Sequence, residues 1–407
     1  MINSSPFQHR EQSIGDIMSL VIMACIPGIC MSTWFFGYGL IINIVLAACC
    51  ALAFEAAALL LRSRSLMQLK DNSALLTAVL FAIAIPPGSP WWLVVTGIFV
   101  AIVLVKHLYG GLGQNPFNPA MTAYVFLLLA FPLDMTSWHV PVPLEGAVGS
   151  TVLSNSLPNL SGFDNAIASS SMSSLGWQSL KLSLLATLPF LSAFYENPET
   201  AVELIDGMAM ATPLIEYKMA GKSALLASWD SGLNIFSRQS ETAWEMANIS
   251  YLVAGLYLLY KGIISWHIPL SIVVTVLIIS SLFYAPGSSS VFGTPYLHLF
   301  GSATMIGAFF IATDPVSAAT SKSGKIIYGI LIGCAIYSIR VWGSYLDSIA
   351  LAVLFGNFFA PLLDHYCRPR IYGHKKHTSD GLGFRKKTLP LLGKLRVEKS
   401  KAEEIES

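Results

Sequence analysis

The sequence predicts an all-α integral membrane protein that crosses the bilayer about ten times. Of its 407 residues, 54% are hydrophobic and only 12% are charged, whereas a soluble domain carries roughly 25% charged residues. The apolar residues gather in blocks of about twenty, the length of helix that spans ~30 Å of hydrocarbon. The composition therefore excludes a large soluble core, and the net charge of +1 gives no sign of a nucleic-acid partner.

Ten apolar blocks follow one another between polar or Pro/Gly-rich breaks. They predict membrane spans at residues 16–35, 39–61, 73–87, 91–108, 117–133, 247–262, 267–285, 297–313, 325–340 and 346–364. The third and eighth blocks are short for a full crossing and end in Pro86-Pro87 and Asp314-Pro315. Each is a candidate for a broken or partly re-entrant helix, which a membrane protein tolerates only where it lines a protein-enclosed cavity.

Basic residues collect on one side of this predicted topology. They are Arg10, Arg62, Arg64, Lys70, Lys106, Lys261, Lys322, Lys325 and the basic tail that begins at Arg368. The opposite short loops, 33–38, 86–91 and 286–296, contain no Lys or Arg. Because short cytoplasmic loops carry an excess of Lys and Arg, both termini are predicted to be cytoplasmic. The N-terminus lacks the features of a signal peptide, so the first span is predicted to be retained.

Four parts of the chain follow from this topology. They are a first five-span membrane repeat at 1–133, an extracytoplasmic segment at 134–246, a second five-span membrane repeat at 247–367 and a basic cytoplasmic tail at 368–407. The middle segment holds eleven acidic residues against four basic ones. The tail reads as a solvated end that contacts anionic lipid.

An internal repeat relates the two membrane parts. A shift of 229 places Ser73 on Ser302 and Phe81 on Phe310, and the same shift aligns Ala123, Phe126 and Pro132 with identical residue types. Because each part has five spans, the second enters the membrane upside down, as in the inverted repeats of many transporters. The alternative is that apolar stretches resemble one another by composition alone.

A Gly/Asn-Pro segment, LYGGLGQNPFNPAM at 108–121, must break the helical backbone. Glycine is flexible and each proline lacks an N–H, so a continuous lipid-facing helix is excluded. The amides of Asn115 and Asn118 could then hold a polar ligand ring or a phosphate at a helix N-terminus. The alternative is an Asn cap followed by Pro in the first helical turn.

Other polar residues within the apolar blocks have two interpretations. The six cysteines form no CxxC pair or Cys/His cluster, so packed thiols and no metal site are expected. Glu55 lies inside the second span, and Asp314 ends the eighth. Buried acids either belong to an ion or proton path or make a helix contact. For Asp314, a hydrogen-bonded contact or a position at the membrane interface is favoured.

Several long runs of sequence carry a family resemblance. They are KDNSALLT, KHLYGGLGQNPFNPAM, GSATMIGAFFIATDPVSA and RPRIYGHKK, within a stretch of roughly 5–376. The chain resembles the D subunits of Rnf ion-translocating electron transport complexes, RnfD or RsxD, and more distantly NqrB of the sodium-pumping NADH:quinone reductase. This NqrB/RnfD resemblance implies a multi-pass subunit in the bacterial inner membrane. It also implies electron relay coupled to ion transport, as part of a translocase that is not catalytic alone.

The resemblance further implies one covalently bound FMN. In the family, its phosphate forms a phosphoester with threonine in a D-G-x-[ST]-x-A-T motif, and a flavin transferase installs it outside the cytoplasm. Here Asp206, Gly207, Ala211 and the acceptor Thr212 match the motif, whereas Ala209 stands where the family usually has Ser or Thr. Thr212 also precedes Pro213 as a helix N-cap would, which is compatible with a phosphate at that position.

The relation to NqrB implies a second, noncovalent flavin, riboflavin, with Asn115 and Asn118 as candidate contacts. The implied partners are the A, B, C, E and G subunits of the Rnf/Rsx complex, the flavin transferase and membrane lipid. A small-solute transporter or channel is the rival interpretation, because inverted repeats with broken helices also describe such proteins. The motif ending at Thr212 distinguishes the two, since a channel has no use for it.

Overall fold

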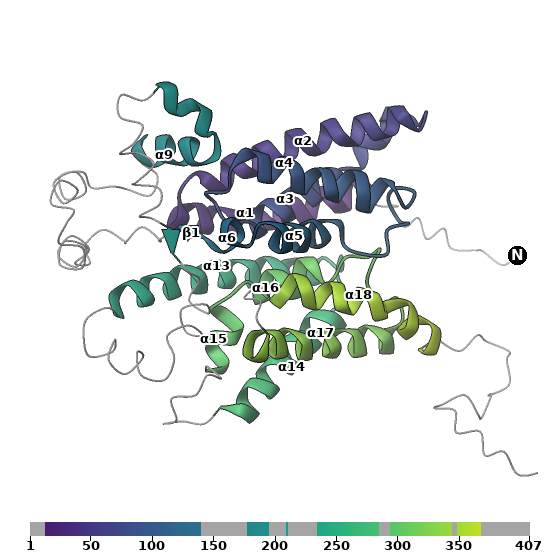
Figure 1. Ribbon diagram of the computed structural model, residues 1–407. Helices are drawn as coiled ribbons and strands as arrows, with labels where there is room; N and C mark the ends of the chain where they lie inside the picture. Colours follow the sequence, from purple (N-terminus) through teal and green to yellow (C-terminus); the bar gives the residue numbers. More distant parts are fainter. Residues whose placement is uncertain are drawn as a thin grey trace, which may run out of the picture. The chain divides into compact units, whose positions relative to one another are not determined.

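The computed structural model describes residues 13–139, 177–194, 209–210, 234–284, 294–343 and 348–367 (Figure 1). This part of the chain is mostly helical, as predicted. Its only strands are the two-residue segments β1 (Trp138–His139) and β2 (Ala209–Met210), which pair with each other in antiparallel fashion.

The first group of helices follows the predicted order of the first five spans. It consists of α1 (Ile14–Phe36), α2 (Gly39–Leu61), the 3₁₀ helix η1 (Leu66–Asp71), α3 (Ser73–Ala84), α4 (Trp91–Phe99), the π-helix η2 (Val100–His107), α5 (Pro119–Ala130) and α6 (Pro132–Thr136). A capping box between Ser13 and Asp16 begins α1. As predicted, the third helix ends before Pro86-Pro87, because the prolines cannot continue its hydrogen bonding.

The second group begins with α13 (Asn234–Tyr260) and α14 (His267–Phe283). It continues with α15 (Pro295–Phe300), α16 (Thr304–Ile306), the π-helix η4 (Gly307–Ile311), α17 (Lys322–Trp342) and α18 (Ser348–Tyr366). Between the two groups, α9 (Trp177–Thr187) contacts α2 and is followed by η3 (Pro189–Phe194).

Two predicted boundaries differ from the structure. Helix α13 begins at Asn234, whereas the sequence predicted a span that begins at 247, so the end of the predicted 134–246 segment is helical. The predicted eighth span, 297–313, is divided between α15, α16 and η4, with a break at Gly301. Sequence hydropathy overlooks the start of α13, because polar residues can extend a helix beyond the apolar block. The divided eighth span agrees with the broken helix predicted there, and glycine permits the break at Gly301.

Within the described residues, four helices are long and apolar enough to cross a membrane by themselves: α1, α2, α17 and α18. Four shorter apolar segments accompany them: α3, α4 with η2, α5 and α14. A single apolar core of buried residues draws on both groups of helices. These features are those of a multi-pass membrane protein.

Small residues allow close approach between helices. A Cβ atom at Gly28 of α1 would lie 2.2 Å from the ring of Tyr251 on α13. A Cβ atom at Gly329 of α17 would lie 1.8 Å from Ser271 Oγ on α14, and Gly333, one turn further, faces Thr275 in the same way. Such small-residue contacts are the usual means by which membrane helices approach closely.

Several elements recur at the offset of 229 residues. Helix η1 starts at Leu66 and α15 at Pro295, and each has a hydroxyl N-cap, Ser65 in one case and Thr294 in the other. In the other matched stretch, α5 begins at Pro119, and the residue 229 positions later, Ser348, is helical in α18.

Candidate functional site

The structure describes only the middle of the segment 206–212, to which the family resemblance assigns FMN. Asp206, Gly207, Ala211 and Thr212 lie outside the described residues, whereas Ala209 and Met210 form β2. In the pairing with β1, Met210 lies opposite Trp138 and Ala209 opposite His139.

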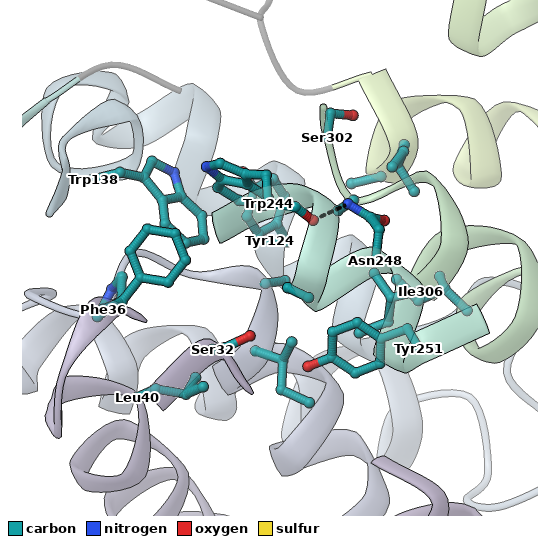
Figure 2. A pocket seen from close by; sticks show the side chains of 18 of the residues that line it. Ser32, Phe36, Leu40, Tyr124, Trp138, Trp244, Asn248, Tyr251, Ser302 and Ile306 are labelled. Carbon is teal, nitrogen blue, oxygen red and sulfur yellow. Dashed lines mark hydrogen bonds between the residues drawn. The ribbon is translucent and has the colours of Figure 1, made fainter. Parts of the chain in front are cut away.

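Beside β1 lies a cavity of about 1160 Å³, part of it open to solvent, which we call the aromatic cleft (Figure 2). Its walls come from both groups of helices. The lining residues are Ser32, Phe36, Leu40, Ile83, Ala84, Pro87, Met121, Tyr124, Leu128, Met135, Thr136, Trp138, Trp244, Ala247, Asn248, Tyr251, Ser302, Ala303, Ile306, Ile311, Ile349 and Ala350. A mostly apolar cavity with a few polar groups is the usual form of a cofactor site.

Three aromatic side chains form one wall of the aromatic cleft. The ring centroids of Trp138 and Trp244 lie 4.8 Å apart, and Phe36 lies 5.9 Å from Trp138 and 5.6 Å from Trp244. All three contacts are edge-to-face, a favourable geometry for aromatic rings. The sequence gives no sign of this cluster, because its members are separated by about a hundred residues each and carry no local motif.

Asn248 links α13 to the broken helix beside the aromatic cleft by hydrogen bonds. Its Nδ2 donates to the carbonyl oxygens of Trp244 (2.9 Å) and Phe300 (2.8 Å), and its Oδ1 accepts from the backbone N–H of Met305 (3.2 Å). The amide thereby satisfies backbone groups that the break between α15 and α16 leaves without helical partners. Asn248 thus holds the broken helix against α13.

A second cavity, of about 860 Å³, lies between the same groups of helices, and we call it the Asn118 cavity. Its lining includes Met18 of α1, Thr77 of α3, Asn118 before α5 and Asp314 after η4. Asn115 is not among the lining residues. The two cavities share α1, α3, α5, α13 and η4 as walls.

The structure confirms the capping interpretation of Asn118. The side chain is 4% exposed, and its Oδ1 accepts from the backbone N–H groups of Ala120 (3.0 Å) and Met121 (3.3 Å) at the start of α5. Its Nδ2 donates to the carbonyl oxygen of Ile311, 3.3 Å away at the end of η4. Asn115 is also buried and donates to the carbonyl oxygen of Phe117 (3.0 Å). These hydrogen bonds do not exclude a ligand, since each side-chain amide has a second N–H group that could donate to one.

The predicted backbone break before Asn115 is present. Gly110, Gly111 and Gly113 adopt φ angles of +126°, +104° and +87°, which favour glycine. The Arg64 guanidinium donates to the carbonyl oxygen of Gly110 (3.0 Å) and ties this loop to the end of α2. The loop is therefore held in place despite its glycines.

Glu55 makes a buried helix contact with basic residues. Lys106 Nζ lies 2.8 Å and 2.9 Å from the two carboxylate oxygens and donates to Ser73 Oγ (2.8 Å). His107 Nε2 lies 3.0 Å from Glu55 Oε2. Lys106, which the sequence placed among the cytoplasmic charges, is only 2% exposed. Its head group is buried because α2, α3 and η2 meet around it.

The serine at the repeat offset from Ser73 has an analogous partner. Ser302 accepts a hydrogen bond from the buried guanidinium of Arg340, which also donates to Thr304 Oγ1 (2.9 Å). Asp314 accepts from Ser317 Oγ (2.7 Å) and is only partly buried. The local bond at Asp314 is consistent with the hydrogen-bonding role predicted for it.

Asn118 variants separate its two structural roles. Asn118→Ala is expected to lower the free energy of unfolding by about 1–2 kcal/mol through loss of the N-cap. Asn118→Asp keeps an N-cap oxygen but cannot donate to Ile311, so it should affect mainly the contact between α5 and η4. Thermal unfolding of both variants in detergent checks this. Equal stability of Asn118→Ala and the unmodified chain would rule out the capping role.

A model of the NQR2, RnfD, RnfE family matches residues 1–373. The D subunit of the ion-translocating oxidoreductase complex of Yersinia pseudotuberculosis is 45% identical over 377 residues, which cover 92% of this chain and 98% of that protein. The D subunits of the same complex from Vibrio atlanticus and Vibrio cholerae are 43% and 44% identical over 376 residues, or 92% of this chain and 99% of each.

The match leaves out only the end of the basic tail and includes both cavities, the strand pair and the motif around Thr212. A family model that covers nearly the whole chain, together with relatives at this identity and coverage, decides the membership. The chain belongs to the NQR2, RnfD, RnfE family.

Proposed function

We propose that this chain is the membrane subunit of an Rnf-type ion-translocating oxidoreductase, carries FMN covalently on Thr212 and relays electrons coupled to ion transport. The observation that carries the proposal is the pairing of β2, inside the motif, with β1, whose Trp138 lines the aromatic cleft. Relatives of similar length are named as the D subunits of such complexes.

The residues of the aromatic cleft fit a flavin ring. Phe36, Trp138 and Trp244 offer aromatic surface, and the remaining walls are largely apolar. These side chains would hold the isoalloxazine by stacking and exclude water from it. FMN supplies one- or two-electron exchange when bound, and the chain positions and tunes it. The sequence pattern at Thr212-Pro213, which predicts a helix N-cap, is compatible with a phosphate, because a helix N-terminus favours an anion.

A second, noncovalent flavin, riboflavin, is assigned to the Asn118 cavity. Its polar lining residues are Thr77, Asn118, Thr313 and Asp314. Asn115 does not line the cavity, but it donates to the carbonyl oxygen of Phe117, the residue before Asn118. Two flavin sites along one seam between the groups of helices would let this chain relay electrons between them.

The matching N-caps of η1 and α15, together with the sequence matches at the same offset of 229, support two inverted five-helix halves and about ten spans. In that arrangement both termini face the cytoplasm of a bacterial cell, and Thr212 lies on the far side of its inner membrane. The proposed partners are the A, B, C, E and G subunits of the complex and the flavin transferase. Reaction with the soluble electron donor belongs to those partners, so the chain is an enzyme only as part of the translocase.

Thr212→Ala is expected to abolish covalent flavin. The chain is expressed with its transferase, denatured, separated on a gel and viewed by flavin fluorescence. The unmodified chain and Thr200→Ala, a threonine of the same segment outside the motif, should both fluoresce. A fluorescent Thr212→Ala band would exclude this acceptor, and a dark unmodified chain would favour the small-solute transporter or channel.

A further inference from the structure

Tyr251 places a hydroxyl inside the aromatic cleft. The side chain is 4% exposed, and its Oη makes no hydrogen bond of normal geometry with the residues that the structure describes. Ser32, from α1, lines the same cavity (Figure 2). Buried polar groups that lack a well-formed hydrogen bond are rare in folded proteins, and a ligand or water commonly completes them.

Two neighbouring elements pack against the ring of Tyr251. A Cβ atom at Gly28 would lie 2.2 Å from the ring, so the backbone of α1 contacts the ring directly. Phe310 of η4 packs edge-to-face at a centroid distance of 6.0 Å. Because the ring is packed in this way, its hydroxyl has a fixed orientation, which a group that orients a ligand requires.

The spacing along α13 suits a planar, fused ring system. Trp244 and Tyr251 are seven residues apart, so they share a helix face about 10 Å apart along the axis. Trp244 belongs to the aromatic wall, whereas Tyr251 and Ser32 provide hydroxyls further along the cavity. The amide of Asn248, between them, is already bound to backbone groups. A ring stacked on Trp244 would therefore meet hydroxyl groups at its other end.

We propose that Tyr251, with Ser32 beside it, is a positioning residue that donates a hydrogen bond to the polar edge of the flavin ring in the aromatic cleft. This inference rests on the proposed function and names the residue that tunes its cofactor. Electron density on the carbonyl edge of a flavin increases when the flavin is reduced. A donor at that edge stabilises reduced flavin more than oxidised flavin, because hydrogen bonds to negative charge are stronger. The Tyr251 hydroxyl therefore raises the reduction potential.

The test is a redox titration of the full-length chain, expressed with its flavin transferase and followed by flavin absorbance. Tyr251→Phe removes the oxygen and keeps the packed ring. Tyr337→Phe is the matched control, since the Tyr337 hydroxyl is also buried without a hydrogen bond to the described residues but lies outside both cavities. A Thr212→Ala chain identifies which flavin couple belongs to the covalent cofactor.

Tyr251→Phe is expected to keep covalent fluorescence and to lower the potential of that couple. A tenfold change in the ratio of reduced to oxidised flavin corresponds to about 30 mV for a two-electron couple, and a shift of that order is expected. Tyr337→Phe should leave the couple unchanged. An unaltered potential in Tyr251→Phe overturns this inference alone. Absence of covalent flavin from the unmodified chain overturns the proposed function and this inference together.

Discussion

Glu55→Ala is expected to destabilise the protein by about 3–5 kcal/mol, since it leaves the buried Lys106 ammonium without its carboxylate. Lys106 is 2% exposed, and Ser73 would remain as its neutral partner. A single hydroxyl cannot compensate for a buried positive charge. Thermal or denaturant unfolding in detergent measures the effect, with the apparent melting temperature as the readout.

The partner variant makes this expectation specific to the ion pair. Glu55→Leu combined with Lys106→Met removes both charges and should recover most of the stability lost by Glu55→Ala, because an apolar pair of similar volume often replaces a buried salt bridge without loss. The double variant separates charge burial from packing. If the double variant were as unstable as Glu55→Ala, packing of the acidic side chain would be the cause instead.

Gly329→Leu is expected to have the second large effect, through the contact of α17 with α14. A Cβ atom there would lie 1.8 Å from Ser271 Oγ and 2.9 Å from the carbonyl oxygen of Ile268. The serine side chain could rotate, but the carbonyl belongs to the helix backbone and cannot give way locally. Overpacking of this kind typically costs about 1–3 kcal/mol and occasionally more, and forced separation of two helices places this case at the upper end.

Ile330→Leu is the control, since it changes the next residue of α17, whose side chain is 41% exposed. It should leave the unfolding temperature close to that of the unmodified chain. The comparison uses the same assay in the same detergent. If Gly329→Leu unfolded at the same temperature as Ile330→Leu, α14 and α17 would not pack as closely as described.

The sequence predicted the helices well where hydropathy and helix breakers agree. Helix α2 has the predicted bounds, and α3 ends before Pro86-Pro87. The start of α13 at Asn234 was missed because its first turns are polar, and a polar turn gives no hydropathy signal. The short eighth block correctly indicated a broken helix, but not the position of the break at Gly301, because an apolar run with one glycine is also compatible with a continuous helix.

The site was predictable only where a local motif defines it. The Asn-Pro pattern correctly indicated Asn118 as an N-cap. In contrast, no sequence pattern indicated that Lys106 pairs with Glu55, because the two are 51 residues apart and proximity across that distance is a tertiary property. The gathering of Trp138, Trp244 and Tyr251 in the aromatic cleft was not predictable for the same reason. The role of Asp206, Gly207, Ala211 and Thr212 in FMN attachment remains a prediction from the family resemblance.

The central claim is that electrons pass through covalent flavin on Thr212 and that this passage drives ion transport. Its most direct test is the complete complex, reconstituted in liposomes, with electron transfer and ion accumulation measured in the same preparation. A complex with Thr212→Ala should assemble with all its subunits but lose both activities, while Thr200→Ala should retain both. Ion accumulation that persists in the assembled Thr212→Ala complex, driven by the same electron donor, would contradict the account.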